Sequence, residues 1–121
     1  MTRFKSQGFA NTFKNARKGF RLVLKSEMNI RVHIIIAILV LISAFLLEFS
    51  HIEYCIVLFA IAMVIITEML NTAIEFTLDA VFHNKYSKLV GMAKDISAGA
   101  VMFASVIAVI IGLIVFGKHI L

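Results

Sequence analysis

The chain has 121 residues, of which 61% are hydrophobic and 16% are charged, and it contains neither Pro nor Trp. Soluble domains contain about 45–50% apolar residues, so this composition argues against a soluble protein and favours a membrane protein. The formal net charge of +5 does not indicate a nucleic-acid-binding protein. Its basic residues lie beside apolar segments, which is typical of the cytoplasmic ends of membrane spans.

Eleven of the twelve Lys and Arg residues form two groups. Eight lie at or before position 31, and three lie in a region from 85 to 94 that we expect to be one loop. They are Arg3, Lys5, Lys14, Arg17, Lys18, Arg21, Lys25 and Arg31, and then Lys85, Lys88 and Lys94. Because positive loops stay inside, we predict a cytoplasmic amino terminus and a loop on the same side of the membrane.

Residues 1–30 predict an amphipathic helix on the membrane surface. Apolar residues recur there at steps of three and four, and most of the basic residues lie off this stripe. The stripe consists of Phe9, Phe13, Ala16, Phe20 and Val23. Such a helix lies in the headgroup layer with its cations toward anionic lipid. The alternative is a soluble basic arm, in which case the Phe spacing is accidental.

Three apolar segments follow, at 32–51, 52–80 and 96–116. Each is about long enough to cross a bilayer as a helix. The acidic stretch from Glu48 to Glu53 contains no Lys or Arg, which places it outside. The second segment continues without Gly or Pro beyond its apolar part, so we expect a cytoplasmic extension of one long helix. Small residues from Ser97 to Ala100 favour close contact with another helix at the start of the third segment.

Polar side chains recur along one face of the second segment. Glu68, Asn71, Glu75 and Asp79 are spaced by three, four and four residues, which places them on one stripe about 16 Å long, and Thr72 lies beside them. An acid facing hydrocarbon costs about 2.5–3.5 kcal/mol at the centre of a span. The stripe must therefore face protein, water or a bound cation. For Glu75 and Asp79, a solvated helix end is the alternative.

The types of residue on this stripe indicate phosphoryl transfer. Mg²⁺ is bound by one or two carboxylates together with substrate phosphates, and Glu75, nearer to water, suits that role. Glu68, nearest to lipid, suits a general base toward a hydroxyl that arrives from the bilayer. Glu27 either completes the metal site or is a surface residue. The pair Lys94 and Asp95 lies at the same membrane face and suits a nucleotide phosphate. The chain has no phosphate-binding loop motif, which excludes the known soluble kinase folds.

Two strings of residues carry a resemblance to a known family. EMLNTAIEFTLD, from Glu68 to Asp79, and AKDISAGAV, from Ala93 to Val101, resemble the small integral-membrane lipid kinases of prokaryotes, the diacylglycerol kinase and undecaprenol kinase family. The resemblance is weaker from Gly19 to Arg31. It is strongest to the Gram-positive branch, which implies undecaprenol as the acceptor.

The resemblance implies an all-α membrane protein, a homotrimer whose chains each contribute a surface helix and three spans to shared active sites. It implies ATP and Mg²⁺, with Glu68 as the catalytic base and Glu27 and Glu75 as metal ligands. It also implies that Asn71, Lys94 and Asp95 belong to the nucleotide site and that the loop containing Tyr86 contacts nucleotide. His33 stands where some relatives have an acid and receives no role.

Three functions from different classes account for these features. The first is a lipid kinase at the cytoplasmic face of the inner membrane, phosphorylating undecaprenol or, alternatively, diacylglycerol. The second is a small proton-coupled transporter subunit, although such proteins place one essential acid near the midplane. The third is a structural partner for helix assembly, which leaves the stripe unexplained. Three thin helices cannot surround this stripe and also cover ATP, so the first function needs neighbouring chains.

Overall fold

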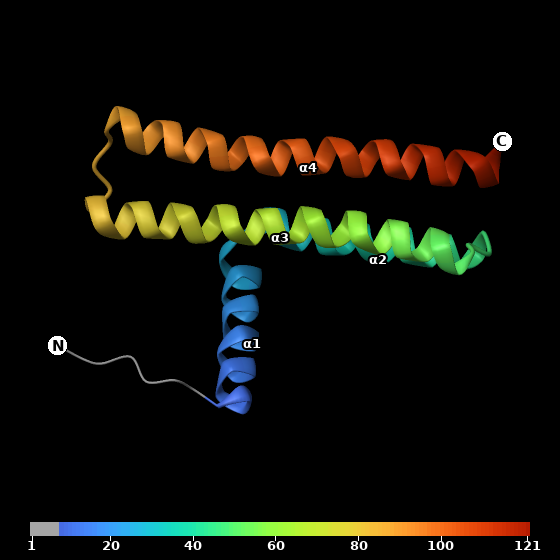
Figure 1. The fold of residues 1–121 in the computed structure, drawn as a ribbon, viewed down its shortest axis with the longest axis horizontal. Coiled ribbons are helices and arrows are strands. Elements are labelled where there is room, and N and C mark those ends of the chain that lie inside the picture. Colours follow the sequence, from blue (N-terminus) through green and yellow to red (C-terminus); the bar gives the residue numbers. More distant parts are fainter. Residues whose placement is uncertain (1–7) are drawn as a thin grey trace.

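The structure, a computed structural model, describes residues 8–121, and these residues form helices and short turns without any strand. The helices are α1 (Phe9–Ser26), α2 (Met28–Leu46), α3 (His51–Phe82) and α4 (Lys88–Ile120). Figure 1 shows α3 and α4 side by side, α2 behind α3, and α1 at a steep angle to these three helices. The predicted all-α fold is confirmed. Residues 1–7 of the predicted surface helix lie outside the described residues.

α2, α3 and α4 are long and apolar enough to cross a membrane. α2 has 19 residues, whereas α3 and α4 have 32 and 33. At 1.5 Å per residue the two longer helices exceed the hydrocarbon core, which is about 30 Å thick, so both extend beyond it. Large apolar side chains are exposed on all three helices. The chain is therefore a multi-pass membrane protein whose outer surface needs an apolar solvent or further protein.

A single residue separates α1 from α2. Glu27 has φ −118° and ψ 114°, an extended conformation that ends α1 and begins α2. Because the chain turns at this residue, α1 leaves the bundle of three spans instead of continuing α2 (Figure 1). Phe9 and Phe13 on α1 are exposed, while Val23, near the bundle, is buried.

The turn between α2 and α3 is fixed by its polar side chains. Ser50 caps α3: its Oγ accepts a hydrogen bond from the Glu53 backbone N–H at 3.2 Å, and the Glu53 carboxylate accepts one from the Ser50 N–H at 3.0 Å. This reciprocal pair is a capping box and satisfies two backbone donors at the helix start. Glu48 has a positive φ of 56° and carries the chain around the turn.

The same end of the bundle holds the apolar cluster. Ala44, Phe49, Val57 and Val115 are buried together, which joins the turn to α2, α3 and α4. The His119 ring stacks on Phe49 with centroids 4.6 Å apart, and its Nε2 lies 2.6 Å from Glu53 Oε2. The carboxyl end of α4 is thus tied to the amino end of α3.

The turn between α3 and α4 is shorter than the basic loop that we predicted. His83 and Asn84 have positive φ values of 53° and 62°, as their turn-forming residue types lead one to expect. The prediction that Lys88 and Lys94 lie in this loop is wrong, because α4 already begins at Lys88. Ser87 causes this early start by accepting a hydrogen bond from the Val90 N–H at 3.2 Å.

We predict that Ser50→Ala lowers the free energy of unfolding by about 1 kcal/mol, because it removes the side-chain cap of α3. Chemical unfolding in detergent micelles measures the change. Ser43→Ala is the matched control, since the Ser43 hydroxyl only donates to the Leu39 carbonyl within α2. Equal stability of the two variants would contradict the role of the cap.

Candidate functional site

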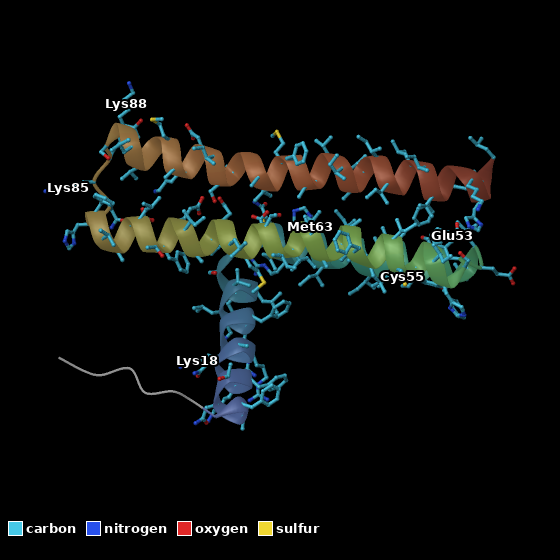
Figure 2. The ribbon with its side chains drawn as sticks, in the orientation of Figure 1. Lys18, Glu53, Cys55, Met63, Lys85 and Lys88 are labelled. Carbon is cyan, nitrogen blue, oxygen red and sulfur yellow. The ribbon has the colours of Figure 1, made fainter. Side chains whose placement is uncertain are left out.

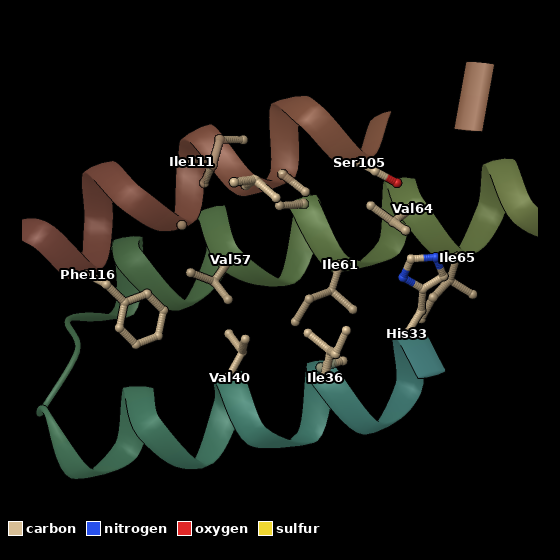
Figure 3. A pocket seen from close by; sticks show the side chains of 15 residues that line it. His33, Ile36, Val40, Val57, Ile61, Val64, Ile65, Ser105, Ile111 and Phe116 are labelled. Atoms are coloured by element: carbon tan, nitrogen blue, oxygen red, sulfur yellow. The ribbon is translucent and has the colours of Figure 1, made fainter. Parts of the chain in front are cut away.

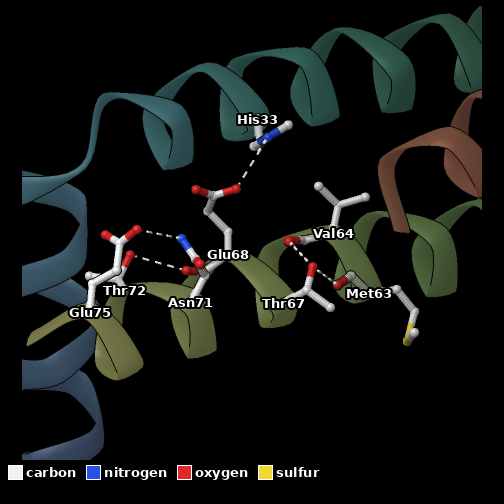
Figure 4. Close-up of polar contacts among 8 residues, drawn as sticks. All are labelled: His33, Met63, Val64, Thr67, Glu68, Asn71, Thr72 and Glu75. Carbon is white, nitrogen blue, oxygen red and sulfur yellow. Dashed lines mark hydrogen bonds and ion pairs between the residues drawn. The ribbon is translucent and has the colours of Figure 1, made fainter. Parts of the chain in front are cut away.

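The polar stripe of α3 faces the other helices. Glu68 and Thr72 are 3% and 4% exposed, although both lie in a largely apolar helix. Asn71, Glu75 and Asp79 are half-buried. Figure 2 shows polar side chains along the space between α3 and α4, and Figure 4 shows Glu68, Asn71 and Glu75 of the stripe, with Thr72 beside them, at close range. The prediction that the stripe avoids lipid is confirmed for Glu68.

Glu68 lies opposite a histidine of α2. Its Oε2 is 3.8 Å from His33 Nε2, and the His33 side chain is 27% exposed (Figure 4). The Thr72 hydroxyl donates to the Glu68 carbonyl oxygen at 3.1 Å, which leaves the carboxylate free of that bond. A buried carboxylate next to an imidazole can accept a proton from a hydroxyl placed between the two groups.

Asn71 is held in one orientation by α4. The hydroxyl of Ser97, which is buried, donates to Asn71 Oδ1 at 2.7 Å. The Asn71 Nδ2 is therefore turned the other way and donates to Glu75 Oε1 at 3.4 Å. This chain of bonds fixes Glu75 from a residue 22 positions further along the sequence. It gives the stripe a defined geometry that its spacing alone does not provide.

Asp79 is paired with Lys94 across the two helices. The Lys94 ammonium lies 2.8 Å from Asp79 Oδ1, and both side chains are about two-fifths exposed. Asp79 is therefore both paired and partly solvated, which agrees with the alternative of a solvated helix end as well as with a role in the site. An exposed pair of this kind contributes little stability. The pair instead fixes the position of the Lys94 ammonium, which it holds beside the acidic stripe and within electrostatic reach of Glu75.

The remaining predicted site residues, Tyr86, Asp95 and Glu27, make no polar side-chain contact with the stripe within residues 8–121. Tyr86 is 83% exposed, but its hydroxyl rests on α4, where a Cβ added to Gly91 would lie only 2.7 Å away. Asp95 is exposed next to Lys94, and Glu27 is half-buried at the break between α1 and α2. A bound nucleotide could reach Tyr86 and Asp95 from solvent.

No three His, Cys, Asp or Glu side chains converge on a metal position among residues 8–121. Mg²⁺ does not require such a cluster, since it keeps several waters and takes its other ligands from phosphates. Glu75 offers a suitable donor: its Oε2 has no hydrogen bond within the described chain, while its Oε1 is held by Asn71. The residues present therefore fit Mg²⁺ that arrives with a nucleotide.

Sequence reasoning missed the partners that come from other helices. Ser97 was taken only as a small packing residue, and His33 received no role. Both are polar residues within apolar segments, which is the signal that could have singled them out. The pairing of Lys94 with Asp79 was also missed, because a loop was expected at Lys94.

Comparison with known proteins gives the same assignment across most of the chain. Residues 14–116 match the prokaryotic diacylglycerol kinase family. An undecaprenol kinase of Bacillus subtilis is 41% identical over 108 residues, covering 89% of this chain and 87% of the relative. A diacylglycerol kinase of Escherichia coli K12 is 31% identical over 115 residues, 93% of each chain.

A third relative is longer than this chain. A diacylglycerol kinase of Synechocystis is 34% identical over 101 residues, which cover 84% of this chain but only 58% of the relative. The match of the family over more than half of the chain, together with these relatives, settles its class. The chain belongs to the prokaryotic diacylglycerol kinase family and is a lipid kinase.

Proposed function

We propose that the protein transfers the γ-phosphate of ATP, in the presence of Mg²⁺, to the hydroxyl of a lipid alcohol, with undecaprenol as the acceptor. The observation that carries this proposal is the burial of Glu68, which is 3% exposed in an apolar helix and lies 3.8 Å from His33. The Bacillus subtilis relative supports undecaprenol. The relatives that are diacylglycerol kinases support the alternative acceptor, diacylglycerol.

Glu68 is the proposed catalytic base. As the acceptor oxygen forms its bond to the γ-phosphorus, the bond from that phosphorus to the leaving ADP oxygen breaks, and the hydroxyl proton passes to the Glu68 carboxylate. Phosphoryl transfer needs little covalent assistance, so the gain comes mainly from positioning and charge neutralisation. A buried carboxylate serves this purpose because its geometry is fixed before the substrate arrives.

Glu75 and Glu27 are the proposed Mg²⁺ ligands, and Asn71 holds Glu75. Mg²⁺ supplies neutralisation of the phosphate charge when it is bound with ATP. The bond from Asn71 Nδ2 to Glu75 Oε1 leaves the other oxygen of Glu75 available. Glu27 lies at the start of α2, where the chain changes direction, and completes the metal site from that element.

Lys94, Asp95 and Tyr86 form the proposed nucleotide site. The Lys94 ammonium supplies positive charge for the phosphates, and Asp79 keeps it near the stripe until they arrive. Asp95 follows it in the sequence and is exposed, and the exposed Tyr86 contacts α4 at Gly91, at the end of the bundle that we assign to the cytoplasm. The nucleotide therefore enters from water, while the lipid alcohol enters from the membrane.

We place the chain in the inner membrane as one domain, with α1 in the headgroup layer and with the spans that the sequence predicts at 32–51, 52–80 and 96–116 corresponding to α2, α3 and α4. The amino terminus and the active site are cytoplasmic and the carboxyl terminus is outside. We also propose a homotrimer. The small residues Ala98, Gly99 and Ala100 are exposed on α4 and permit close approach of another chain. No partner is a nucleic acid.

We predict that Glu68→Gln lowers turnover by about two to four orders of magnitude, because the amide cannot accept the hydroxyl proton. Formation of lipid phosphate from ATP by purified protein in mixed micelles measures this. Helical content and thermal unfolding should be unchanged. Glu48→Gln, an exposed acid in the turn before α3, is the control and should retain activity. Near-normal turnover of Glu68→Gln would defeat the assignment of the base.

A second experiment tests the acceptor. The kcat/KM of the wild-type protein is measured for undecaprenol and for diacylglycerol in parallel assays, with each lipid at the same mole fraction in the same type of micelle. We expect the higher value for undecaprenol. A preference for diacylglycerol would reverse the choice of acceptor and leave the kinase assignment intact.

A third experiment tests the nucleotide site. Lys94→Gln should raise the KM for ATP by about tenfold or more, because a charged hydrogen-bond donor to phosphate is lost. The KM for the lipid should change little. Lys118→Gln, near the far end of α4, is the matched control. An unchanged KM for ATP in Lys94→Gln would remove Lys94 from the site.

A further inference from the structure

An apolar cavity of about 300 Å³ lies between α2, α3 and α4. Figure 3 shows His33 at one end of it and Phe116 at the other. Among the fifteen lining residues only His33 and Ser105 have polar side chains. The cavity therefore suits a hydrocarbon along its length and a polar group at one end.

The cavity runs along the spans. On α3 its lining extends from Val57 to Ile65, a rise of about 12 Å at 1.5 Å per residue. Val57 also belongs to the buried cluster at the turn between α2 and α3, which closes that end. The opposite end is formed by His33, which faces Glu68. A lipid chain in the cavity would lie in the same direction as the chains of the surrounding bilayer.

The distance between His33 and Glu68 suits one hydroxyl group. At 3.8 Å, Nε2 and Oε2 are too far apart for a direct hydrogen bond. An oxygen to one side of the line that joins them, about 2.8 Å from each atom, can donate a hydrogen bond to the carboxylate and accept one from the Nε2–H tautomer of the imidazole. An alcohol has the single donor and the free acceptor positions that this arrangement requires.

We propose that His33 orients the acceptor hydroxyl against Glu68 and that this cavity receives the part of the acceptor tail nearest to the hydroxyl. The proposal rests on the kinase function proposed above. One hydrocarbon chain suits the volume, whereas a helix of a second copy, about 10 Å wide with its side chains, does not. A long tail exceeds the cavity, so its remainder lies in lipid and only its first isoprene units are recognised.

The tail part of the proposal is tested by filling the cavity at its far end. Gly112 lines the cavity, and a Cβ added there meets no atom within 4 Å. Gly112→Leu should therefore fold and raise the KM for farnesol by about tenfold, since a buried apolar contact of several carbons is lost. The KM for dimethylallyl alcohol, which is too short to reach Gly112, should not change. Gly117→Leu is the matched control, because Gly117 is equally open but lies outside the lining.

The hydroxyl part is tested at His33. His33→Leu should lower kcat/KM by about tenfold for farnesol and dimethylallyl alcohol alike, because the lost hydrogen bond is at the end that both alcohols share. His33→Gln, whose amide N–H can donate from a similar position, should recover most of the activity. The KM for ATP should be unchanged in both variants, which a general loss of structure would not produce.

Failure of this inference and failure of the proposed kinase function give different results. If the wild-type protein phosphorylates no alcohol, undecaprenol included, both the proposed function and the inference fail. If it phosphorylates undecaprenol but Gly112→Leu affects both short alcohols equally, or neither, the cavity is not the tail site. A change in oligomeric mass of Gly112→Leu without a change in KM would instead assign the cavity to contact between copies. Failure of His33→Gln to recover activity would remove His33 from the hydroxyl site.

Discussion

The constraint on which the structure depends is the burial of an acid inside an apolar helix. Glu68 is 3% exposed, and a carboxylate removed from water without partners is costly. The fold brings polar groups from three helices to this part of the bundle, and one of them, His33 of α2, lies 3.8 Å from the carboxylate. The Thr72 hydroxyl bonds to the Glu68 backbone carbonyl, and Ser97 of α4 bonds to Asn71 on the same stripe.

The two ends of the bundle are built differently, and this difference sets what each can do. At the turn between α2 and α3, a capping box, a buried Phe49 and the contact of His119 with Glu53 join three helices tightly. At the other end, α3 and α4 are linked by a five-residue turn and by the half-exposed pair of Lys94 with Asp79. Few buried contacts oppose motion at this second end, which is the end at which we propose that the nucleotide enters.

Much of the fold was predictable because its signals are local. The lengths of the apolar segments predicted the three long helices. The spacing of Glu68, Asn71, Glu75 and Asp79 predicted that these residues share one face of the second of them. The break at Glu27 and the early start of α4 were not predicted, since each depends on one residue's conformation or cap. The partners of the stripe were not predictable either. Whether Ser97 meets Asn71, or His33 meets Glu68, depends on how far one helix slides along another, and spacing within a single helix carries no information about that.

The acids of the stripe become more exposed from Glu68 onward, and this gradient links the structure to the proposed chemistry. Glu68 is buried, whereas Glu75 and Asp79 are half-buried. A transporter acid would need access to water from both sides in turn, which a one-way gradient does not provide. Phosphoryl transfer from a soluble nucleotide to a lipid instead needs a site whose two ends differ. One end is closed to water, and there the lipid hydroxyl gives up its proton. The other end is open to water, and there the charged phosphates are bound. Because a single chain already has this polarity, additional chains need only cover the phosphates and are not required to create it.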